Sequence, residues 1–366
     1  MKKVLFLIHD LGQGGAEKVL VNLVNNMDLS KFDITVMSLF GGGVNEQFLR
    51  PEIHYVSLFK KMIPGNSKIM KLCSPSMLHR LFIREKYDIE ISYLEGPSAR
   101  IISGCQNPKI KLVSWIHVEQ HTMEQLAYSF RSPKEAVKCY NQFDQTVCVS
   151  QYVHDDFCEI IDFKKKCSVL YNTVESQWIL DQSREEAKEL QEDGLIRLIA
   201  VGTLKKSKGY DRLLRIAKNL HNRVHLYILG AGPLQIEMER FISSEGIEST
   251  ITLLGYNTNP YKYVARCDLF VCASHSEGFS TAATEALIVG TPVCTVEVSG
   301  MKEMLGENNE YGVVTENSEE ALYEGIKKLI DNPELLAYYK KQAEIRGKRF
   351  STENTVRAVE EMLLSL

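Results

Sequence analysis

The sequence contains no long hydrophobic run. A helix that spans a bilayer needs about 18 or more consecutive apolar residues, and no segment of these 366 residues approaches that length. The first apolar segment, Val4–Ile8, is followed directly by His9 and Asp10 and is too short for a signal peptide. We therefore expect no membrane span, and we interpret this start as a first β-strand.

The cysteines lack the spacing of a metal site or a disulfide framework. There are nine, an odd number, and none forms a CxxC pair. Several lie inside apolar segments typical of strands, among them Cys148, Cys272 and Cys294. This distribution indicates reduced core residues of a cytoplasmic protein.

The first glycine-rich turn lacks the last glycine of a dinucleotide-binding fingerprint. Residues 11–17 read LGQGGAE, so Glu17 stands where GxGxxG requires glycine. An NAD-dependent oxidoreductase is therefore a poor interpretation. The glycines still permit a ligand to approach the backbone closely, although they would equally serve a tight strand-to-helix connection.

Neither sign of charge dominates the chain. The net charge is −4, with 25% charged and 44% hydrophobic residues, which is ordinary for a soluble globular protein of two domains. Residues 1–170 carry 21 Lys and Arg against 18 Asp and Glu, whereas residues 171–366 carry 22 against 29. This balance does not favour a nucleic-acid partner.

Positive charge gathers in the segment 59–86, which we call the basic segment. Its basic residues are Lys60, Lys61, Lys68, Lys71, Arg80, Arg84 and Lys86, and they are interleaved with apolar ones. Such a mixture is typical of peripheral contact with an anionic membrane, and equally of a solvated helix packed on its own domain.

Short apolar runs alternate with helical patterns in two series, as expected of parallel sheets. The first series is Val4–Ile8, 34–39, 89–93, 112–116, 146–149 and 168–171; the second is 197–201, Val224–Leu229, 251–253, 269–273, Val293–Val296 and 312–314. The pattern predicts an α/β protein with two Rossmann-like, doubly wound domains. The expected bounds are 1–172 for the first domain, 173–195 for a linker, 196–348 for the second domain and 349–366 for a C-terminal helix.

Two glutamates flank a strand-to-helix junction in the second series. Glu277 precedes a helix expected from Thr281 to Val289, and Glu285 lies inside it. The helix start is a favourable site for a phosphate, and Glu285 is about 6 to 7 Å farther along the axis, where a ribose would follow. Alternatively, Glu277 is solvated and Glu285 supports the helix start electrostatically.

A lysine follows the first strand of the second series. Lys208 should lie near the carboxyl edge of the sheet, as Glu277 does, and a lysine there would neutralise a diphosphate. Three lysines in four residues also fit a solvated surface loop.

Taken in order, these motifs resemble those of the family-four glycosyltransferases with the GT-B fold, the glycosyl transferases group 1. The matching elements are GGAE at 14–17, Trp115-Ile116-His117, Val149-Ser150, the segment 202–209, Gly230-Ala231-Gly232, Glu277 with Glu285, and Gly290-Thr291-Pro292-Val293.

The resemblance implies two domains that face a cleft, with the C-terminal helix returning to the first domain. It implies a retaining enzyme that takes a sugar from a UDP or GDP sugar without a metal or other cofactor. By this resemblance, Glu285 contacts the ribose, Glu277 the donor sugar and Tyr256 the nucleobase. The diphosphate is contacted by Lys208 and by the backbone of Phe279, Ser280 and Thr281. From the first domain, Gly14 and Gly15 contact the donor, and His117 contacts the sugar near its reacting carbon.

One departure concerns the diphosphate. The family usually has arginine where this chain has Thr203, so a bidentate guanidinium is missing. Lys205 or Lys206 is a candidate substitute. Outside the family pattern, His117 would be interpreted as a buried, hydrogen-bonded histidine at a strand end.

The expected function is sugar transfer to a glycan or lipid-linked acceptor in bacterial surface polysaccharide assembly, at the cytoplasmic face of the membrane. The alternatives are a sugar-nucleotide epimerase on the same fold and a non-catalytic nucleotide-sugar-binding subunit. Tyr93, Glu95 and His121 are candidates for the acceptor side.

Overall fold

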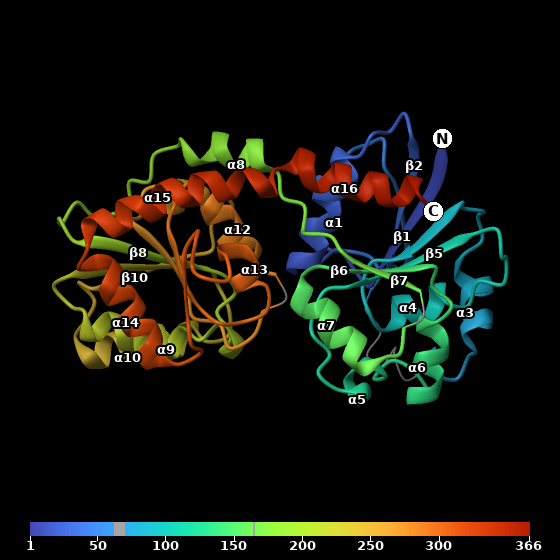
Figure 1. Ribbon diagram of the computed structural model, residues 1–366, viewed down its shortest axis with the longest axis horizontal. Coiled ribbons are helices and arrows are strands. Elements are labelled where there is room, and N and C mark those ends of the chain that lie inside the picture. The colour runs from blue at the N-terminus through green and yellow to red at the C-terminus, as the bar shows by residue number, and fades with distance from the viewer. Residues whose placement is uncertain (62–69, 164, 278) are drawn as a thin grey trace. The chain divides into compact units, whose positions relative to one another are not determined.

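The computed structural model describes residues 1–61, 70–163, 165–277 and 279–366, which divide into two compact units (Figure 1). Unit 1 consists of residues 1–174 and 352–366, and unit 2 of residues 175–351. Each unit has a parallel sheet with helices on both faces. The predicted α/β class with two doubly wound domains is confirmed.

The sheet of unit 1 has seven strands in the order β3-β2-β1-β4-β5-β6-β7. Their bounds are β1 Lys2–Ile8, β2 Phe32–Phe40, β3 His54–Phe59, β4 Ile89–Ser92, β5 Lys111–Ile116, β6 Gln145–Cys148 and β7 Lys166–Val169. The strand β3 was not predicted. It lies at the edge of the sheet and is partly exposed along its length, so it lacks the continuous apolar run of a buried strand.

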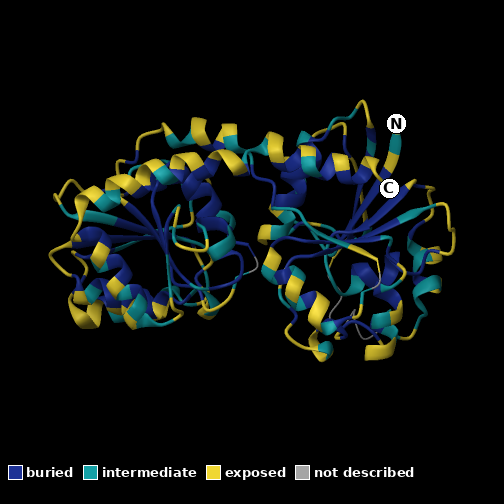
Figure 2. Cartoon of the chain, viewed as in Figure 1, coloured by how far each residue is buried: buried dark blue, intermediate teal, exposed yellow. Residues whose placement is uncertain are grey.

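The sheet of unit 2 has six strands in the order β10-β9-β8-β11-β12-β13. Their bounds are β8 Ile196–Val201, β9 Val224–Leu229, β10 Ile251–Gly255, β11 Leu269–Cys272, β12 Val293–Val296 and β13 Val313–Thr315. The strands β9, β11 and β12 are buried along their whole length (Figure 2). All six were predicted as apolar runs.

The order of the strands reverses once in each sheet. In unit 1, β1 pairs with both β2 and β4, with Val4 opposite Ile34 and Ile89. In unit 2, β8 pairs with both β9 and β11. Doubly wound sheets bind ligands at the carboxyl ends of the strands where the order reverses. The loops after β1, β4, β8 and β11 are therefore the first places to look for a site.

The helices of unit 1 are α1 Gly15–Asn26, α3 Pro75–Phe82, α4 Pro97–Ile102, α5 Met123–Leu126, α6 Pro133–Tyr140, α7 Gln151–Ile160 and α16 Thr352–Leu364. Those of unit 2 are α8 Ser176–Ser183, α9 Tyr210–Asn219, α10 Gln235–Glu245, α11 Tyr261–Val264, α12 Thr281–Ile288, α13 Met301–Leu305, α14 Glu319–Ile330 and α15 Pro333–Gly347. Within the described ranges, no helix combines the length and the hydropathy of a membrane span.

The last helix, α16, packs on unit 1 beside α1 (Figure 1). Its apolar face includes Val359 and Leu363, which are 1% and 0% exposed. Glu360 Oε1 accepts a hydrogen bond from the backbone of Asp28 at 2.6 Å. The predicted return of the C-terminal helix to the first domain is confirmed.

The segment expected as a linker, 173–195, contains α8 and packs largely on unit 2. Trp178 lies edge-on to Tyr261 with ring centroids 5.4 Å apart, and Ile179 is 1% exposed. The backbone of Gln191 donates to the Tyr227 hydroxyl at 2.8 Å. The division between the units falls after Val174.

Gly209 fixes the connection between β8 and α9. Its φ is 64°, in the left-handed region, and a Cβ there would lie 1.9 Å from Ala273 O. Both the backbone conformation and the space therefore require glycine. The close approach brings the loops after β8 and β11 together.

We predict that Gly209→Ala destabilises the protein more than Gly246→Ala does. Gly246 caps α10 with a φ of 63° and has nothing within 4 Å of a built Cβ, so alanine there meets only the backbone strain, about 1 kcal/mol. Alanine at 209 would also collide with the backbone, so the free energy of unfolding should fall by about 3 kcal/mol or more. Urea unfolding of the two variants tests this. Equal shifts in the unfolding midpoint would contradict the role of the close approach.

Candidate functional site

Lys208 and Glu277 meet at the carboxyl edge of the unit 2 sheet. Lys208 ends the short 3₁₀ helix η2 (Lys206–Lys208) after β8, and Glu277 lies in the loop after β11. Lys208 Nζ lies 2.6 Å from Glu277 Oε1, and Ser274 Oγ donates to the same oxygen at 2.7 Å. The side chains are 24% and 11% exposed. This charge-assisted bond joins the two loops.

A pocket opens beside this ion pair within unit 2. It is lined by Ala200, Val201, Lys208, Tyr210, Leu213, Phe270, Val271, Cys272, Ala273, Ser274, Glu277 and Ser280. The polar and charged side chains among them include Lys208, Ser274, Glu277 and Ser280, which lie at the ion pair and at the start of α12.

The helix α12 starts at the same edge. Ser280 caps it, because its hydroxyl accepts a hydrogen bond from the backbone of Ala283 at 3.3 Å. Thr281 is the first helical residue. The positive end of the helix dipole and the Lys208 ammonium group thus both lie at this edge, where a diphosphate would be favourable.

Glu285 lies one turn inside α12 and is 8% exposed. The Tyr261 hydroxyl, from α11, donates to Glu285 Oε1 at 3.2 Å. This contact helps to hold the carboxylate in one orientation. The sequence predicted the place of Glu285 in the helix but gave no signal for its contact with Tyr261.

Three more of the predicted donor residues, Thr203, Tyr256 and Phe279, lie on the same unit. The Phe279 ring is buried and packs against Phe350 with centroids 5.7 Å apart, so its ring serves packing. Thr203 is exposed, as are the lysines at 205 and 206 that follow it. Tyr256 is 72% exposed directly after β10, where its ring is accessible to a base.

A buried arginine supports the Glu277 loop. Arg212, in α9, is 4% exposed; its Nη2 lies 2.9 Å from His275 Nδ1, and its Nη1 donates to Asn317 Oδ1 at 2.9 Å. The backbone of His275 donates to Ser207 O at 2.7 Å. Sequence reasoning missed this support because the residues are distant along the chain and form no motif.

In unit 1, His117 lies at the carboxyl end of β5. Its side chain is buried, and its ring centroid is 4.9 Å from that of Tyr93. Burial lowers the pKa of His117 to about 3, opposed by a hydrogen bond to the Tyr93 backbone, so the ring is neutral at neutral pH. Its Nε2 has no hydrogen-bond partner among the residues that the structure describes. A bound ligand would satisfy this nitrogen.

Glu95 holds the backbone beside His117. Glu95 Oε2 accepts from the backbone of His117 at 3.1 Å, and burial raises the pKa of Glu95. Tyr93, a candidate for the acceptor side, is 1% exposed and packed between two aromatic rings, so its side chain is not available to an acceptor. His121 is exposed at the surface, and its backbone donates to Asp156 Oδ1 at 3.0 Å.

The glycine turn of unit 1 joins β1 to α1. Gly14 caps the helix, and Gly15 is its first residue. A Cβ at Gly14 would lie 2.0 Å from Glu17 Oε2, so the absence of a side chain lets the Glu17 carboxylate fold back over the helix start. Burial raises the pKa of Glu17. At Gly15 nothing lies within 4 Å, which leaves room for a ligand.

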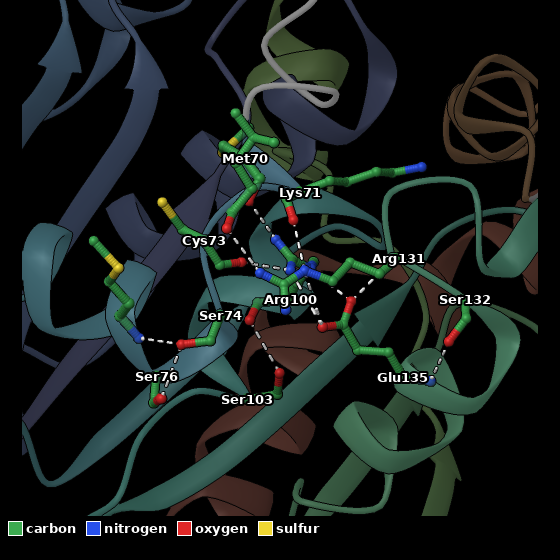
Figure 3. A network of polar contacts seen from close by, with 12 residues as sticks. Met70, Lys71, Cys73, Ser74, Ser76, Arg100, Ser103, Arg131, Ser132 and Glu135 are labelled. Atoms are coloured by element: carbon green, nitrogen blue, oxygen red, sulfur yellow. Dashed lines mark hydrogen bonds and ion pairs between the residues drawn. The ribbon is translucent and has the colours of Figure 1, made fainter.

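A buried arginine in α4 anchors the basic segment (Figure 3). Arg100 is 1% exposed; its Nη1 donates to Met70 O at 2.8 Å and its Nη2 to Cys73 O at 2.7 Å. Its Nε donates to Glu135 Oε2 at 3.0 Å. Sequence reasoning missed this anchor because two of the partners are backbone carbonyls, which carry no sequence signal.

The anchored segment leaves apolar and basic side chains exposed. Arg131 adds hydrogen bonds to Lys71 O at 2.5 Å and Leu72 O at 2.9 Å (Figure 3). The exposed residues between 72 and 86 include Leu72, Met77, Arg80, Leu81, Arg84 and Lys86. We call these six residues the basic face. Residues 62–69 of the basic segment, including Lys68, lie outside the described residues.

Comparisons with known proteins agree with this geometry. The model of Glycosyltransferase Family 4 matches residues 13–178, and that of Glycosyl transferases group 1 matches residues 181–346. One relative is an N-acetylgalactosamine-N,N'-diacetylbacillosaminyl-diphospho-undecaprenol 4-alpha-N-acetylgalactosaminyltransferase of Campylobacter jejuni, 28% identical over 100% of both chains. Another is a lipopolysaccharide core biosynthesis glycosyltransferase of Rhizobium meliloti, 22% identical over 90% of this chain and 88% of the relative.

Solved structures show the same fold. HepE from Anabaena, crystallised in complex with UDP, superposes with a TM-score of 0.78 at 19% identity, over 100% of both chains. The two parallel-sheet units and these matches define a glycosyltransferase of the GT-B fold. The chain belongs to the family-four glycosyltransferases, which the order of its motifs predicted.

The depressed pKa of His117 predicts a pH dependence of stability. In the folded chain the ring stays neutral down to about pH 3, whereas in the unfolded chain it takes up a proton near its ordinary pKa of 6.5. The unfolded state therefore binds more protons between these values, and stability falls as the pH drops from 6.5 towards 3, by up to about 1.4 kcal/mol per pH unit. We expect His117→Phe to remove this contribution.

The measurement is urea unfolding at several pH values between neutrality and the acid limit. His221→Phe is the matched control, because His221 is exposed and its replacement should leave the pH dependence unchanged. Identical pH dependence in the wild type and His117→Phe would show that His117 is not held neutral by burial.

Proposed function

We propose that this glycosyltransferase moves a sugar from a UDP or GDP sugar to a glycan or lipid-linked acceptor in bacterial surface polysaccharide assembly. The observation that carries the proposal is the Lys208–Glu277 ion pair beside the start of α12, with Glu285 one turn farther along the helix. These groups offer a cation, a helix terminus and a carboxylate in the order in which diphosphate and ribose would meet them. The UDP complex of the structurally similar HepE supports a nucleotide donor.

In this proposal the nucleoside diphosphate binds unit 2. Lys208 and the backbone of Phe279, Ser280 and Thr281 bind the diphosphate, Glu285 the ribose, and Tyr256 the base. Glu277 binds hydroxyls of the donor sugar; its bond to Lys208 orients the carboxylate before the donor arrives. Because Thr203 replaces the usual arginine, the exposed lysines at 205 and 206 supply additional positive charge.

By the family resemblance, Gly14 and Gly15 of unit 1 approach the donor, and His117 contacts its sugar. The neutral His117 ring offers Nε2 to a sugar hydroxyl near the reacting carbon. Glu95, whose carboxylate accepts a hydrogen bond from the His117 backbone, is occupied by backbone hydrogen bonds, which favours a positioning role over a nucleophilic one.

The proposed reaction retains the configuration of the sugar without a covalent sugar–enzyme intermediate. The bond from the anomeric carbon to the diphosphate oxygen breaks through an oxocarbenium-like state, and the acceptor hydroxyl attacks from the same face. The departing diphosphate accepts the proton of that hydroxyl. Lys208 and the start of α12 stabilise the negative charge that develops on the diphosphate, which is the largest electrostatic contribution expected of the protein.

The acceptor side is proposed to meet the membrane through the basic face. Leu72, Met77 and Leu81 are 81%, 50% and 48% exposed, and the exposed basic residues Arg80, Arg84 and Lys86 lie beside or after Leu81 in the sequence. The Arg100 anchor holds the backbone that carries Leu72. The name of the Campylobacter relative describes an acceptor linked to diphospho-undecaprenol, a lipid carrier, which supports an acceptor presented at the cytoplasmic membrane face.

We expect a panel of nucleotide sugars to reveal one donor whose nucleoside diphosphate is released in the presence of a lipid-linked acceptor.

Lys208→Gln should lower kcat/KM about 10²- to 10³-fold, because it removes the positive charge that stabilises the departing diphosphate. Glu285→Ala should weaken binding of the nucleoside diphosphate about 10-fold or more, through loss of charged hydrogen bonds. Nucleoside diphosphate release and titration of the nucleotide measure the two effects.

Lys340→Gln is the matched control, since Lys340 is exposed on α15 of the same unit, outside the proposed donor site, and its effect should stay within about 3-fold. Full donor turnover by Glu285→Ala would refute the assignment of ribose binding. Conversion of a nucleotide sugar to its epimer without an acceptor would identify an epimerase, and donor binding without turnover of any acceptor would identify a binding subunit.

We predict that the triple variant Arg80→Gln, Arg84→Gln, Lys86→Gln binds anionic liposomes more weakly. Each basic residue near an anionic surface contributes about 1 kcal/mol, so the loss should be roughly 100-fold. The control removes three exposed positive charges from unit 2, at Lys340, Lys341 and Arg349. Co-sedimentation with vesicles of anionic and neutral lipids measures the binding. An equal loss in both variants would assign binding to net charge rather than to the basic face.

A further inference from the structure

Three cysteines and a histidine from neighbouring elements of unit 1 converge near the edge of its sheet. Cys148 ends β6, Cys167 lies in β7, and His154 and Cys158 lie in α7, which packs on both strands (Figure 1). His154, Cys158 and Cys167 place their ligand atoms within 4.8 Å of one another. Cys148 is not one of this group of three, but its Sγ lies 3.8 Å from Cys167 Sγ. None of these side chains takes part in the proposed transfer.

The distances suit a tetrahedral metal ion. Zinc–sulfur bonds of about 2.3 Å place two thiolates of one tetrahedron about 3.8 Å apart, and a thiolate and an imidazole nitrogen about 3.6 Å apart. The Cys148–Cys167 sulfur distance is 3.8 Å, and Cys158 Sγ lies 3.8 Å from His154 Nε2. His154 and Cys158 are four residues apart in α7, so both project from one face of the helix.

The environment of His154 fits a metal ligand. His154 Nδ1 lies 2.8 Å from Asp155 Oδ1, and Gln151 Nε2 lies 3.1 Å from the same ring nitrogen and 2.7 Å from the same carboxylate oxygen. A proton on Nδ1 donated to Asp155 leaves the lone pair on Nε2, the nitrogen beside Cys158. A carboxylate behind the imidazole is the usual second partner of a metal-bound histidine.

The cluster is open to solvent on one side. Cys158 is exposed, so an ion from solvent can reach it.

We propose that His154, Cys158 and Cys167 form a zinc site, and that Cys148, which contacts Cys167, turns towards the ion as the fourth ligand when it binds. Binding of the ion releases the remaining thiol protons to solvent. Three thiolates and one imidazole are a usual ligand set of structural zinc. The ion ties α7 to β6 and β7. This matters for the loop after β5, because Asp156 of α7 accepts hydrogen bonds from the backbone of Gln120 at 2.6 Å and of His121 at 3.0 Å.

The test uses the full chain, purified anaerobically, stripped with a chelator and titrated with Co²⁺ and then Zn²⁺. We expect about one ion per chain and a thiolate-to-cobalt charge-transfer band that Zn²⁺ abolishes. Cys167→Ser and Cys158→Ser should lose the band, and His154→Gln should weaken Co²⁺ binding at least tenfold. Elemental analysis of the protein as isolated should show zinc.

The matched control is Cys73→Ser, a partly exposed cysteine of the same unit outside the cluster, which should keep the band. Circular dichroism shows whether each variant folds, and the titration of the wild type stands without any variant. Absence of the band in the folded wild type would overturn the proposal. So would an unchanged band in folded Cys167→Ser, or a Cys148–Cys167 disulfide in the anaerobically purified protein.

Discussion

The ion pair between Lys208 and Glu277 is the contact on which the proposed donor site depends. It joins the two loops that flank the reversal of strand order in unit 2, and it is reinforced by Ser274 and by the close approach of Gly209 to Ala273 O. Without a ligand, each charge has the other as its partner, so neither is buried unpaired. A diphosphate at the start of α12 would share the Lys208 ammonium group with Glu277. The Glu277 carboxylate could then also accept hydrogen bonds from the sugar hydroxyls. The ion pair thus holds the two loops together in the absence of the donor.

The topology explains why these residues meet. In a parallel sheet all strands end at one edge, and the chain leaves β8 and β11 in opposite directions to reach helices on opposite faces. Ser280, at the start of α12, lines the pocket beside Lys208 and Glu277. Unit 1 repeats the arrangement at β1 and β4, where the glycine turn at 14 and 15 and the Glu95 carboxylate are found. The same physical rule therefore places the proposed nucleotide contacts at this edge of unit 2, and the glycine turn and Glu95 at the corresponding edge of unit 1.

The strands of both sheets could be predicted from the sequence because buried parallel strands are continuous apolar runs. Among the described strands, only β3, which is partly exposed at the edge of its sheet, was not predicted. The sequence also predicted that Lys208 and Glu277 lie at one edge, because that follows from strand order alone. It did not reveal the Tyr261 contact with Glu285, the Arg100 anchor or the cluster of Cys148, Cys158 and Cys167 with His154. Those contacts join residues from different elements, or side chains to backbone carbonyls, so they depend on packing and leave no local pattern.

The most direct test of the account is a crystal structure of the full chain with a bound nucleoside diphosphate. The account predicts that the diphosphate lies within hydrogen-bond distance of Lys208 Nζ and of the backbone at the start of α12, with ribose hydroxyls on the Glu285 carboxylate. Electron density for the nucleotide at another place, with the Lys208–Glu277 bond undisturbed and Glu285 still bound only to protein groups, would contradict it.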